Sequence, residues 1–231
     1  MILHIETSTN VCSVALSEGN SLLFTLADER GQNHAALLSS FIDSALATLK
    51  PQQQTLDAVA VSAGPGSYTG LRIGVSTAKG LCFGYEVPLI AIDTLQVMTV
   101  AAMEELQLTD AQTLFCPMID ARRMEVYCAM YQADGTIFNA VSAEIITENS
   151  FADLLETHKI YFFGNGAEKC KAVLTHHNAH FLDNIRPLAT NMVALANQKF
   201  AAQNFADTAY FEPFYLKEFQ ATTPKKVKSE K

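Results

Sequence analysis

Short apolar runs in the N-terminal half of the chain alternate with longer segments whose apolar residues recur at helical spacing. Short runs bounded by turn-forming residues are typical of buried strands, and the longer period is typical of amphipathic helices. The pattern predicts three strands followed by alternating helices and strands. The predicted elements are strands 2–6, 11–16 and 22–26, helix 34–49, strand 58–62, helix 71–83, strand 89–92 and helix 94–106.

A similar order of elements recurs in the second half. Its predicted elements are strands 113–119, 124–131 and 136–145, helix 151–158, strand 160–163, helix 166–174 and a late helix 190–203. The two halves match where the first strand of each ends, since HIETSTNVCSVAL corresponds to MIDARRMEVYCAM. Each of these strands ends on an acid, Glu6 or Asp120. Such a duplication predicts two related α/β lobes with the two acids facing a shared cleft.

The domain boundaries follow from this repeat. We expect a first lobe of residues 1–106 together with about 190–216, and a smaller second lobe of residues 107–189. Residues 217–231 are polar and basic and have too few apolar residues to build a core, so we expect a flexible tail there.

The stretch SAGPGSYTGLRIGVSTAKG, residues 62–80, joins a predicted strand to a predicted helix. Gly64 and Gly66 permit backbone angles that are closed to other residues, and Ser67 or Thr69 can cap the helix that follows. The loop lacks the Gly-Lys-Ser/Thr ending of a P-loop. It also does not open the first βα unit, as a dinucleotide fingerprint would. The motif therefore predicts either an anion site or a tight contact between backbones.

The helix after this loop carries only Arg72 and Lys79 as charges between residues 71 and 83. A helix that is apolar on every side must be covered on every side. The small residues Gly70, Gly74 and Ala78 recur at four-residue spacing and would let another helix approach closely. Two interpretations stay open: a helix buried within one domain, or a helix that is half core and half partner interface.

Composition narrows the class of protein. The chain has 231 residues, 49% of them hydrophobic and only 17% charged, which is enough apolar material for a sizeable core. The net charge of −8 argues against strong independent binding of nucleic acid. No apolar run is long enough for a membrane span, and Met1 leads directly into a strand rather than a signal peptide. The five cysteines show no CxxC spacing and indicate reduced core thiols in a cytoplasmic protein.

Other residues whose side chains could act in catalysis or metal binding are better explained by ordinary structural roles. A zinc site at His176, His177 and His180 would need further ligands, and only Asp183 lies near, so we interpret this segment as a surface loop. Asn33 could cap the predicted helix 34–49, and His34 is interpreted as a cap or interface residue rather than a base. A catalytic nucleophile would need a His–Asp partner, and no recognisable one accompanies the three hydroxyls of the glycine-rich segment, Ser62, Ser67 and Thr69.

Together these features resemble the TsaB family, also called YeaZ, within the superfamily of actin, hexokinase and the sugar kinases. The resemblance covers nearly the whole chain and rests on ETSTNVCSVAL, SAGPGSYTGLRIGVSTAKGL, IDTLQ and IDARRMEVYCAMY. It implies two ribonuclease H-like lobes and a bacterial cytoplasmic protein. It also implies a role in making threonylcarbamoyladenosine, which lies beside the anticodon of tRNAs that read codons beginning with adenosine. The family resembles the catalytic subunit TsaD and pairs with it, and TsaE then joins that pair.

The chain departs from TsaD and from the kinases where their chemistry resides. TsaD carries two metal-binding His four residues apart, and the matching positions here are Thr94 and Met98, which do not suit such a metal. The kinase phosphate turn, Asp-x-Gly-x, is here Glu6 to Thr9, and Ser8 in place of glycine narrows the approach of a phosphate. These departures predict a chain that keeps the fold but lacks the metal site of TsaD and the phosphate turn of the kinases. They also argue against a peptidase, because a peptidase of the TsaD type would need the metal.

Weak candidates for a Mg²⁺–nucleotide site remain at Glu6, Thr7, Ser8 and Asp120, although a structural role for the two acids is the favoured interpretation. We expect no catalytic residue, no metal and no cofactor in the chain itself, with a nucleotide only at the interface of the complex and tRNA reached only through it. The alternative is an active small-molecule kinase or metallohydrolase of the same fold.

The helices 34–49 and 71–83 are the predicted partner surface, which the resemblance assigns to TsaD and, in its absence, to a homodimer. The predicted interface residues are His34, Leu37, Leu38, Phe41, Gly70, Leu71, Gly74, Val75, Ala78 and Leu81.

Overall fold

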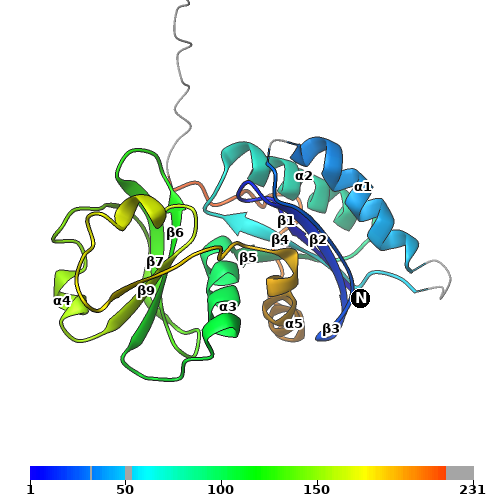
Figure 1. The fold of residues 1–231 in the computed structure, drawn as a ribbon. Coiled ribbons are helices and arrows are strands. Elements are labelled where there is room, and N and C mark those ends of the chain that lie inside the picture. Colours follow the sequence, from blue (N-terminus) through cyan, green and yellow to red (C-terminus); the bar gives the residue numbers. More distant parts are fainter. Residues whose placement is uncertain (32, 50–53, 217–231) are drawn as a thin grey trace, which may run out of the picture.

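Two five-stranded sheets, connected in the same way, form the two halves of the molecule (Figure 1). The structure is a computed structural model that describes residues 1–31, 33–49 and 54–216. The tail predicted at 217–231 lies outside the described residues. Among those that are described, no helix is both long enough and apolar enough to cross a membrane.

The first sheet has the strand order β3-β2-β1-β4-β5. Its strands are β1 (Ile2–Glu6), β2 (Cys12–Glu18), β3 (Ser21–Asp28), β4 (Ala58–Gly64) and β5 (Leu89–Asp93). The first three strands pair antiparallel, whereas β4 and β5 continue the sheet in parallel on the other side of β1. This arrangement places the buried β1 at the centre, where it is covered on both faces.

The second sheet repeats this plan, with the order β10-β9-β6-β7-β8. Its strands are β6 (Thr113–Asp120), β7 (Glu125–Gln132), β8 (Ile137–Ile145), β9 (Lys159–Phe163) and β10 (Ala179–Leu182). The central strand β6 pairs antiparallel with β7 and parallel with β9, as β1 does with β2 and β4. The predicted duplicated α/β fold is therefore confirmed.

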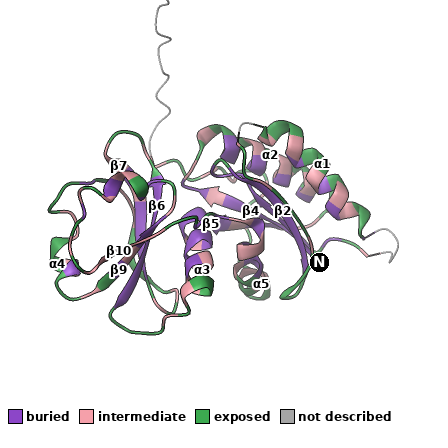
Figure 2. Ribbon diagram, viewed as in Figure 1, coloured by how far each residue is buried: buried purple, intermediate pink, exposed green. Residues whose placement is uncertain are grey.

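Helices cover both faces of the first sheet. Helices α1 (His34–Ala47) and α2 (Tyr68–Tyr85) lie on one face, where Leu38 and Val75 join the strand residue Leu3 in one core. Helix α5 (Val193–Ala201) lies on the opposite face. Helix α3 (Thr94–Leu106) lies between the two sheets and contributes to the cores of both (Figures 1 and 2).

Four segments of the structure differ from the prediction. Strand β10 falls where we expected only a loop, because its four residues are all half-buried at a sheet edge and show no alternation. The helix predicted at 166–174 is a single 3₁₀ turn, Glu168–Cys170, and α4 is shorter than predicted, at Ala152–Leu155. The late helix begins with a 3₁₀ turn, Ala189–Met192, before α5. The proposed lobe boundaries stay a prediction.

Candidate functional site

The turn between β1 and β2 lies directly against the glycine-rich loop that leads into α2. The hydroxyl of Thr7 donates to the carbonyl oxygen of Gly70 at 2.8 Å, and the amide of Ser67 donates to the carbonyl oxygen of Ser8 at 2.6 Å. A Cβ atom at Gly70 would overlap the carbonyl oxygen of Thr7, and one at Gly74 would overlap its hydroxyl. The tight-contact interpretation of the motif therefore holds, because these glycines seat α2 on the β1–β2 turn.

The two helix caps predicted from sequence have different outcomes. The hydroxyl of Ser67 accepts from the amide of Gly70 at 3.2 Å, which confirms the predicted cap of α2. The predicted cap at Asn33 is wrong, since its side chain makes no capping hydrogen bond to α1. His34 follows it, and its ring nitrogen Nε2 lies 3.1 Å from the carbonyl oxygen of Val11, so the ring ties α1 to the end of the β1–β2 turn.

The two acids predicted to face one cleft occupy different environments. Glu6 is fully buried under the β1–β2 turn, where its Oε1 accepts from the amide of Ser8 at 2.6 Å. Burial raises the pKa of Glu6 to about 7. Asp120 is about half exposed and pairs with Lys169. The prediction of two facing acids is therefore wrong for Glu6, which points beneath the turn.

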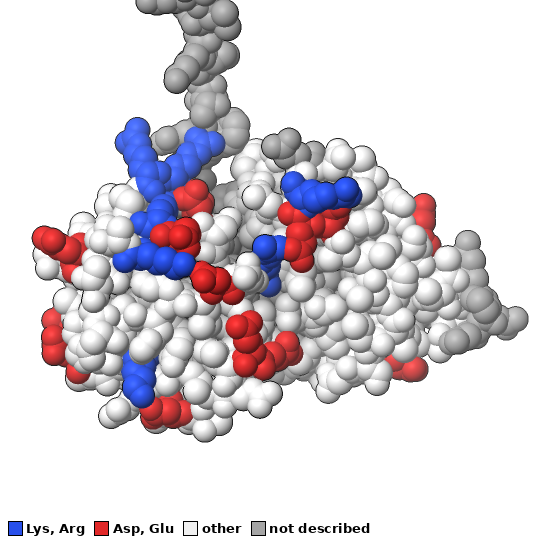
Figure 3. All heavy atoms as spheres, in the orientation of Figure 1, with Lys and Arg blue, Asp and Glu red and all other residues white. Residues whose placement is uncertain are grey.

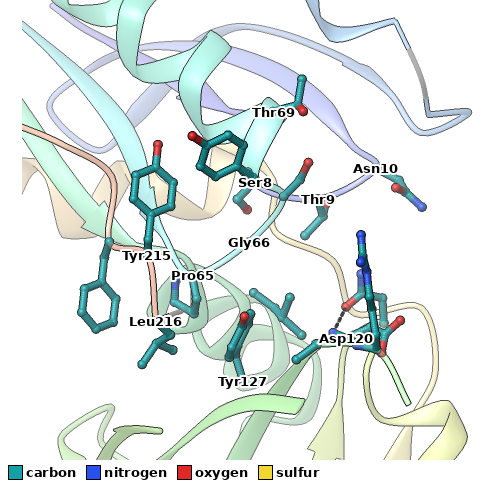
Figure 4. A pocket seen from close by; sticks show the side chains of 17 residues that line it. Ser8, Thr9, Asn10, Pro65, Gly66, Thr69, Asp120, Tyr127, Tyr215 and Leu216 are labelled. Atoms are coloured by element: carbon teal, nitrogen blue, oxygen red, sulfur yellow. Dashed lines mark hydrogen bonds between the residues drawn. The ribbon is translucent and has the colours of Figure 1, made fainter. Parts of the chain in front are cut away.

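A cleft of about 500 Å³ lies between the two halves, at the ends of β1, β4 and β6 (Figure 4). Of the weak nucleotide candidates, Ser8 and Asp120 line it, but Glu6 and Thr7 do not. Its described lining is mostly polar and uncharged, apart from Asp120 and Arg122. The lining residues are Ser8, Thr9, Asn10, Pro65, Gly66, Ser67, Tyr68, Thr69, Ile119, Asp120, Ala121, Arg122, Tyr127, Asn165, Phe214, Tyr215 and Leu216.

The end of the described chain closes one side of this cleft. The amide of Phe214 donates to the carbonyl oxygen of Ala63 at 2.7 Å, and the rings of Tyr215 and Tyr68 lie 5.0 Å apart. Lys79 on α2 donates to the carbonyl oxygen of Ala209 at 2.9 Å. Sequence reasoning missed this segment, because its aromatic residues show no periodic pattern.

Comparisons with known proteins identify the family of this chain and match its fold. A family model described as tRNA N6-adenosine threonylcarbamoyltransferase (TsaD) matches residues 28–225. The tRNA threonylcarbamoyladenosine biosynthesis protein TsaB of Haemophilus influenzae is 30% identical over 226 residues, which cover 94% of this chain and 93% of that protein. This chain belongs to the TsaB family. TsaB of Escherichia coli is also 30% identical, over 94% of each chain. The solved structure of YeaZ from Pseudomonas aeruginosa has 25% identity and a TM-score of 0.76, and the match covers 93% of this chain and 99% of that one.

In this TsaB-family chain, the positions compared with the metal ligands of TsaD lie in the core. Thr94 and Met98 stand in the first turns of α3, and their side chains are almost fully buried. Met98 packs with Phe115 and Phe163 of the second sheet. A buried thioether among aromatic rings offers no open position for a metal. Within the described ranges, no three His, Cys, Asp or Glu side chains form a group that could hold a metal ion.

The histidine cluster is divided among separate contacts. The rings of His176 and His177 lie 4.2 Å apart, whereas His180 lies on β10 and stacks on Tyr161 at 5.0 Å. The interpretation of the whole segment as a loop is wrong for His180. The absence of bound zinc stays a prediction that elemental analysis can check.

Most of the predicted interface residues point into the chain's own core. Six of the ten are buried, so a partner cannot reach their side chains, and the interface prediction is wrong for them: Leu38, Gly70, Leu71, Gly74, Val75 and Ala78. The glycines lie on the face of α2 that contacts Thr7. Val75 and Ala78 belong to the core under the first sheet, and the side chain of Leu71 approaches Gly64. The other four are only half-buried and stay candidates: His34, Leu37, Phe41 and Leu81.

Proposed function

We propose that this chain is a non-catalytic partner subunit of the cytoplasmic bacterial complex that installs the threonylcarbamoyl group on tRNA. The catalytic partner would be TsaD, and TsaE would join the pair. The observation that carries the proposal is the burial of Thr94 and Met98, at the positions where TsaD has its metal ligands, inside a chain that shares the TsaD family model. The kinase and metallohydrolase alternatives have no support from this part of α3.

The outward face of α1 and α2 is the surface best suited to the partner. Phe83 is 85% exposed on α2, and a Cβ atom at Gly80 or Gly84 would meet nothing within 4 Å. Glycine within a helix costs about 1 kcal/mol relative to alanine. At Gly74 the fold needs glycine, because a side chain would overlap Thr7, whereas at Gly80 the fold would accept alanine. Small residues on an exposed helix face let a second helix approach closely, so we assign the partner contact to Gly80 rather than to Gly74.

The exposed face of α1 is also small and weakly charged. It carries one acid, and its exposed residues are Ala35, Ala36, Ser39, Ser40, Asp43 and Ala47. Figure 1 shows α1 and α2 side by side, and Figure 2 shows their outer faces exposed. Two such helices from each subunit would form a four-helix contact with TsaD, or with a second copy of this chain when TsaD is absent.

Reconstitution tests the proposal. The chain, TsaD and TsaE from the same source would be assayed for threonylcarbamoylation of a tRNA transcript, singly and together. We expect modification only when the chain is combined with TsaD, and any nucleotide requirement to belong to the complex. Turnover by the isolated chain at about 1 s⁻¹ on ATP, sugars or peptides would contradict the non-catalytic role.

A further inference from the structure

Strand β3 is the exposed outer strand of the first sheet (Figure 1). Within the described ranges its only ladder partner is β2, so the other side of its backbone faces no strand of that part of the chain. Residues 21–27, SLLFTLA, contain neither a charge nor a proline. Three leucines on this strand are exposed: Leu22 by 46%, Leu23 by 46% and Leu26 by 37%. An uncharged apolar edge of this kind is a template for pairing with another extended strand.

The other outer strands of the two sheets are better protected against such pairing. On β5, the amide of Ala206 donates to the carbonyl oxygen of Leu89 at 2.8 Å, and Lys199 donates to the carbonyl oxygen of Ala91 at 2.6 Å. Strand β10 has only four residues. The ladder of β8 with β7 shifts register twice, whereas the ladder of β3 with β2 shifts once, near the β2–β3 hairpin. Short strands, bulges and covering segments all block edge pairing, so β3 is the most open of these edges.

Charge favours a second copy of this chain as the strand that covers this edge. The chain has a net charge of −8, so two copies repel each other wherever they meet through acidic surface. Figure 3 shows a broad uncharged area on the part of the first half where Figure 1 labels β3, and most of the charged side chains on this face lie elsewhere. The edge accepts an uncharged, apolar, extended strand, and β3 of a second copy is such a strand.

The ends of β3 also suit an antiparallel pair of identical strands. A pair centred on Phe24 aligns residues 21–27 of both copies, and it brings Arg30 of one copy to the end where the other copy has Glu18. Glu18 is exposed, and the side chain of Arg30 is 86% exposed and pairs with Asp28. Because Arg30 offsets Asp28, this arrangement does not set like charges against each other at the two ends.

We propose that β3 pairs with β3 of a second copy, antiparallel about a two-fold axis, and so joins the first sheets of the two copies into one. The contact is closed, because each edge covers the other. It is also continuous with α1, whose half-buried Leu37 and Phe41 pack on the same core as Phe24. The two copies of α1 would lie on the same face of the joined sheet. The inference does not rest on the proposed function, and it leaves the outward faces of α1 and α2 to TsaD.

The test is the self-association of the isolated chain, measured by sedimentation equilibrium. Every sample carries Gly80→Leu, which blocks association through α1 and α2, and is shown to be folded by circular dichroism. We expect this chain to form dimers with a Kd of about 1–10 μM. The variant combines Leu23→Lys with Thr25→Lys at two exposed positions, which sets like charges against each other across the two-fold axis. We expect it to weaken the dimer by at least about tenfold.

A charge-reversed partner and a matched control make the test specific. Leu23→Glu with Thr25→Glu should also dissociate the dimer, and an equimolar mixture of the Lys and Glu variants should restore it, because opposite charges then face each other. The control is Ile137→Lys, which adds a charge at a 63% exposed position on the other open edge, β8, and should leave the dimer unchanged.

Hydrogen exchange gives a second measurement that needs no substitution. In the unsubstituted chain, amides of residues 21–28 should exchange more slowly at high protein concentration than at low concentration, because the partner strand protects them. The proposal is overturned if the Gly80→Leu chain stays monomeric at about 100 μM. It is also overturned if both charged variants still dimerise like the parent, if their mixture stays monomeric, or if exchange over residues 21–28 does not depend on concentration. Dissociation by Ile137→Lys would assign the contact to β8 instead.

Discussion

The hydroxyl of Thr7 donates a hydrogen bond to the carbonyl oxygen of Gly70 at 2.8 Å, which ties the β1–β2 turn to the first turn of α2. The same hydroxyl occupies the space in which a side chain at Gly74 would lie. The glycine-rich motif therefore lets the backbone of α2 pack closely on the β1–β2 turn. Gly74 lies on the inward face of α2 and Gly80 on its outward face, so substitutions at these two positions test this role of the motif.

Substituting Gly74 by alanine should destabilise the fold. The new methyl group would overlap the hydroxyl of Thr7 and contact Val61, and such overpacking costs about 1–3 kcal/mol. Urea unfolding monitored by circular dichroism measures the loss. Gly80→Ala is the matched control, because its methyl group meets open space and should raise stability by up to about 1 kcal/mol. Equal changes in the two variants would disprove the assignment of faces.

The sequence predicted the helices and strands, but not which face of α2 is turned inward. The apolar runs and turn residues were enough to predict strands β1 to β9 and the duplication, because those patterns follow from local periodicity. Four-residue spacing shows that Gly70, Gly74 and Ala78 share a face, but not which neighbour that face meets. Because α2 is apolar on every side, its sequence does not indicate which face packs on the sheet and which faces outward.

The site was predictable only in part for a similar reason. An acid at the end of a strand can point into a cleft or beneath the turn, and Glu6 takes the second course where Asp120 takes the first. Arg122 also lines the cleft, and positions 122 and 123 are arginines in a hairpin turn where glycine or asparagine is usual.

Glu6 should make the stability of the protein depend on pH. Burial raises its folded-state pKa from 4.5 to about 7, so between these values the folded state holds a proton that the unfolded state has lost. The contribution of Glu6 is therefore fully present below pH 4.5, falls as the pH rises, and is lost above about pH 7. Glu6→Gln keeps an oxygen for the amide of Ser8 but cannot ionise.

The measurement compares the free energy of unfolding of Glu6→Gln and the parent at pH 5 and pH 8. The difference should shift in favour of the variant by about 2 kcal/mol at the higher pH. This comparison cancels His4, whose pKa burial lowers to about 3 and whose contribution rises between pH 3 and 6.5, opposing that of Glu6. A pH-independent difference would show that Glu6 is ionised in the folded protein.

Lys79 should hold the C-terminal segment against α2. Its ammonium group donates to the carbonyl oxygens of Ala209 and Phe211 at 2.9 and 3.2 Å. Lys79→Met keeps most of the alkyl chain and removes these bonds, so residues 207–216 should become more sensitive to limited proteolysis. Lys159→Met removes an exposed lysine on β9 as the control. Unchanged cleavage in Lys79→Met would mean that other contacts hold the segment, namely the bond of Phe214 to Ala63 and the ring contact of Tyr215 with Tyr68.

The affinity of TsaD for two leucine variants tests the central claim most directly. Gly80→Leu places a bulky side chain on the outward face of α2, and Ala194→Leu places one on the exposed face of α5, on the opposite side of the sheet. With both variants shown by circular dichroism to be folded, we predict that Gly80→Leu weakens TsaD binding about ten- to a hundredfold and that Ala194→Leu leaves it unchanged. A folded Gly80→Leu that binds TsaD as tightly as the parent would contradict the assignment of this surface to the partner.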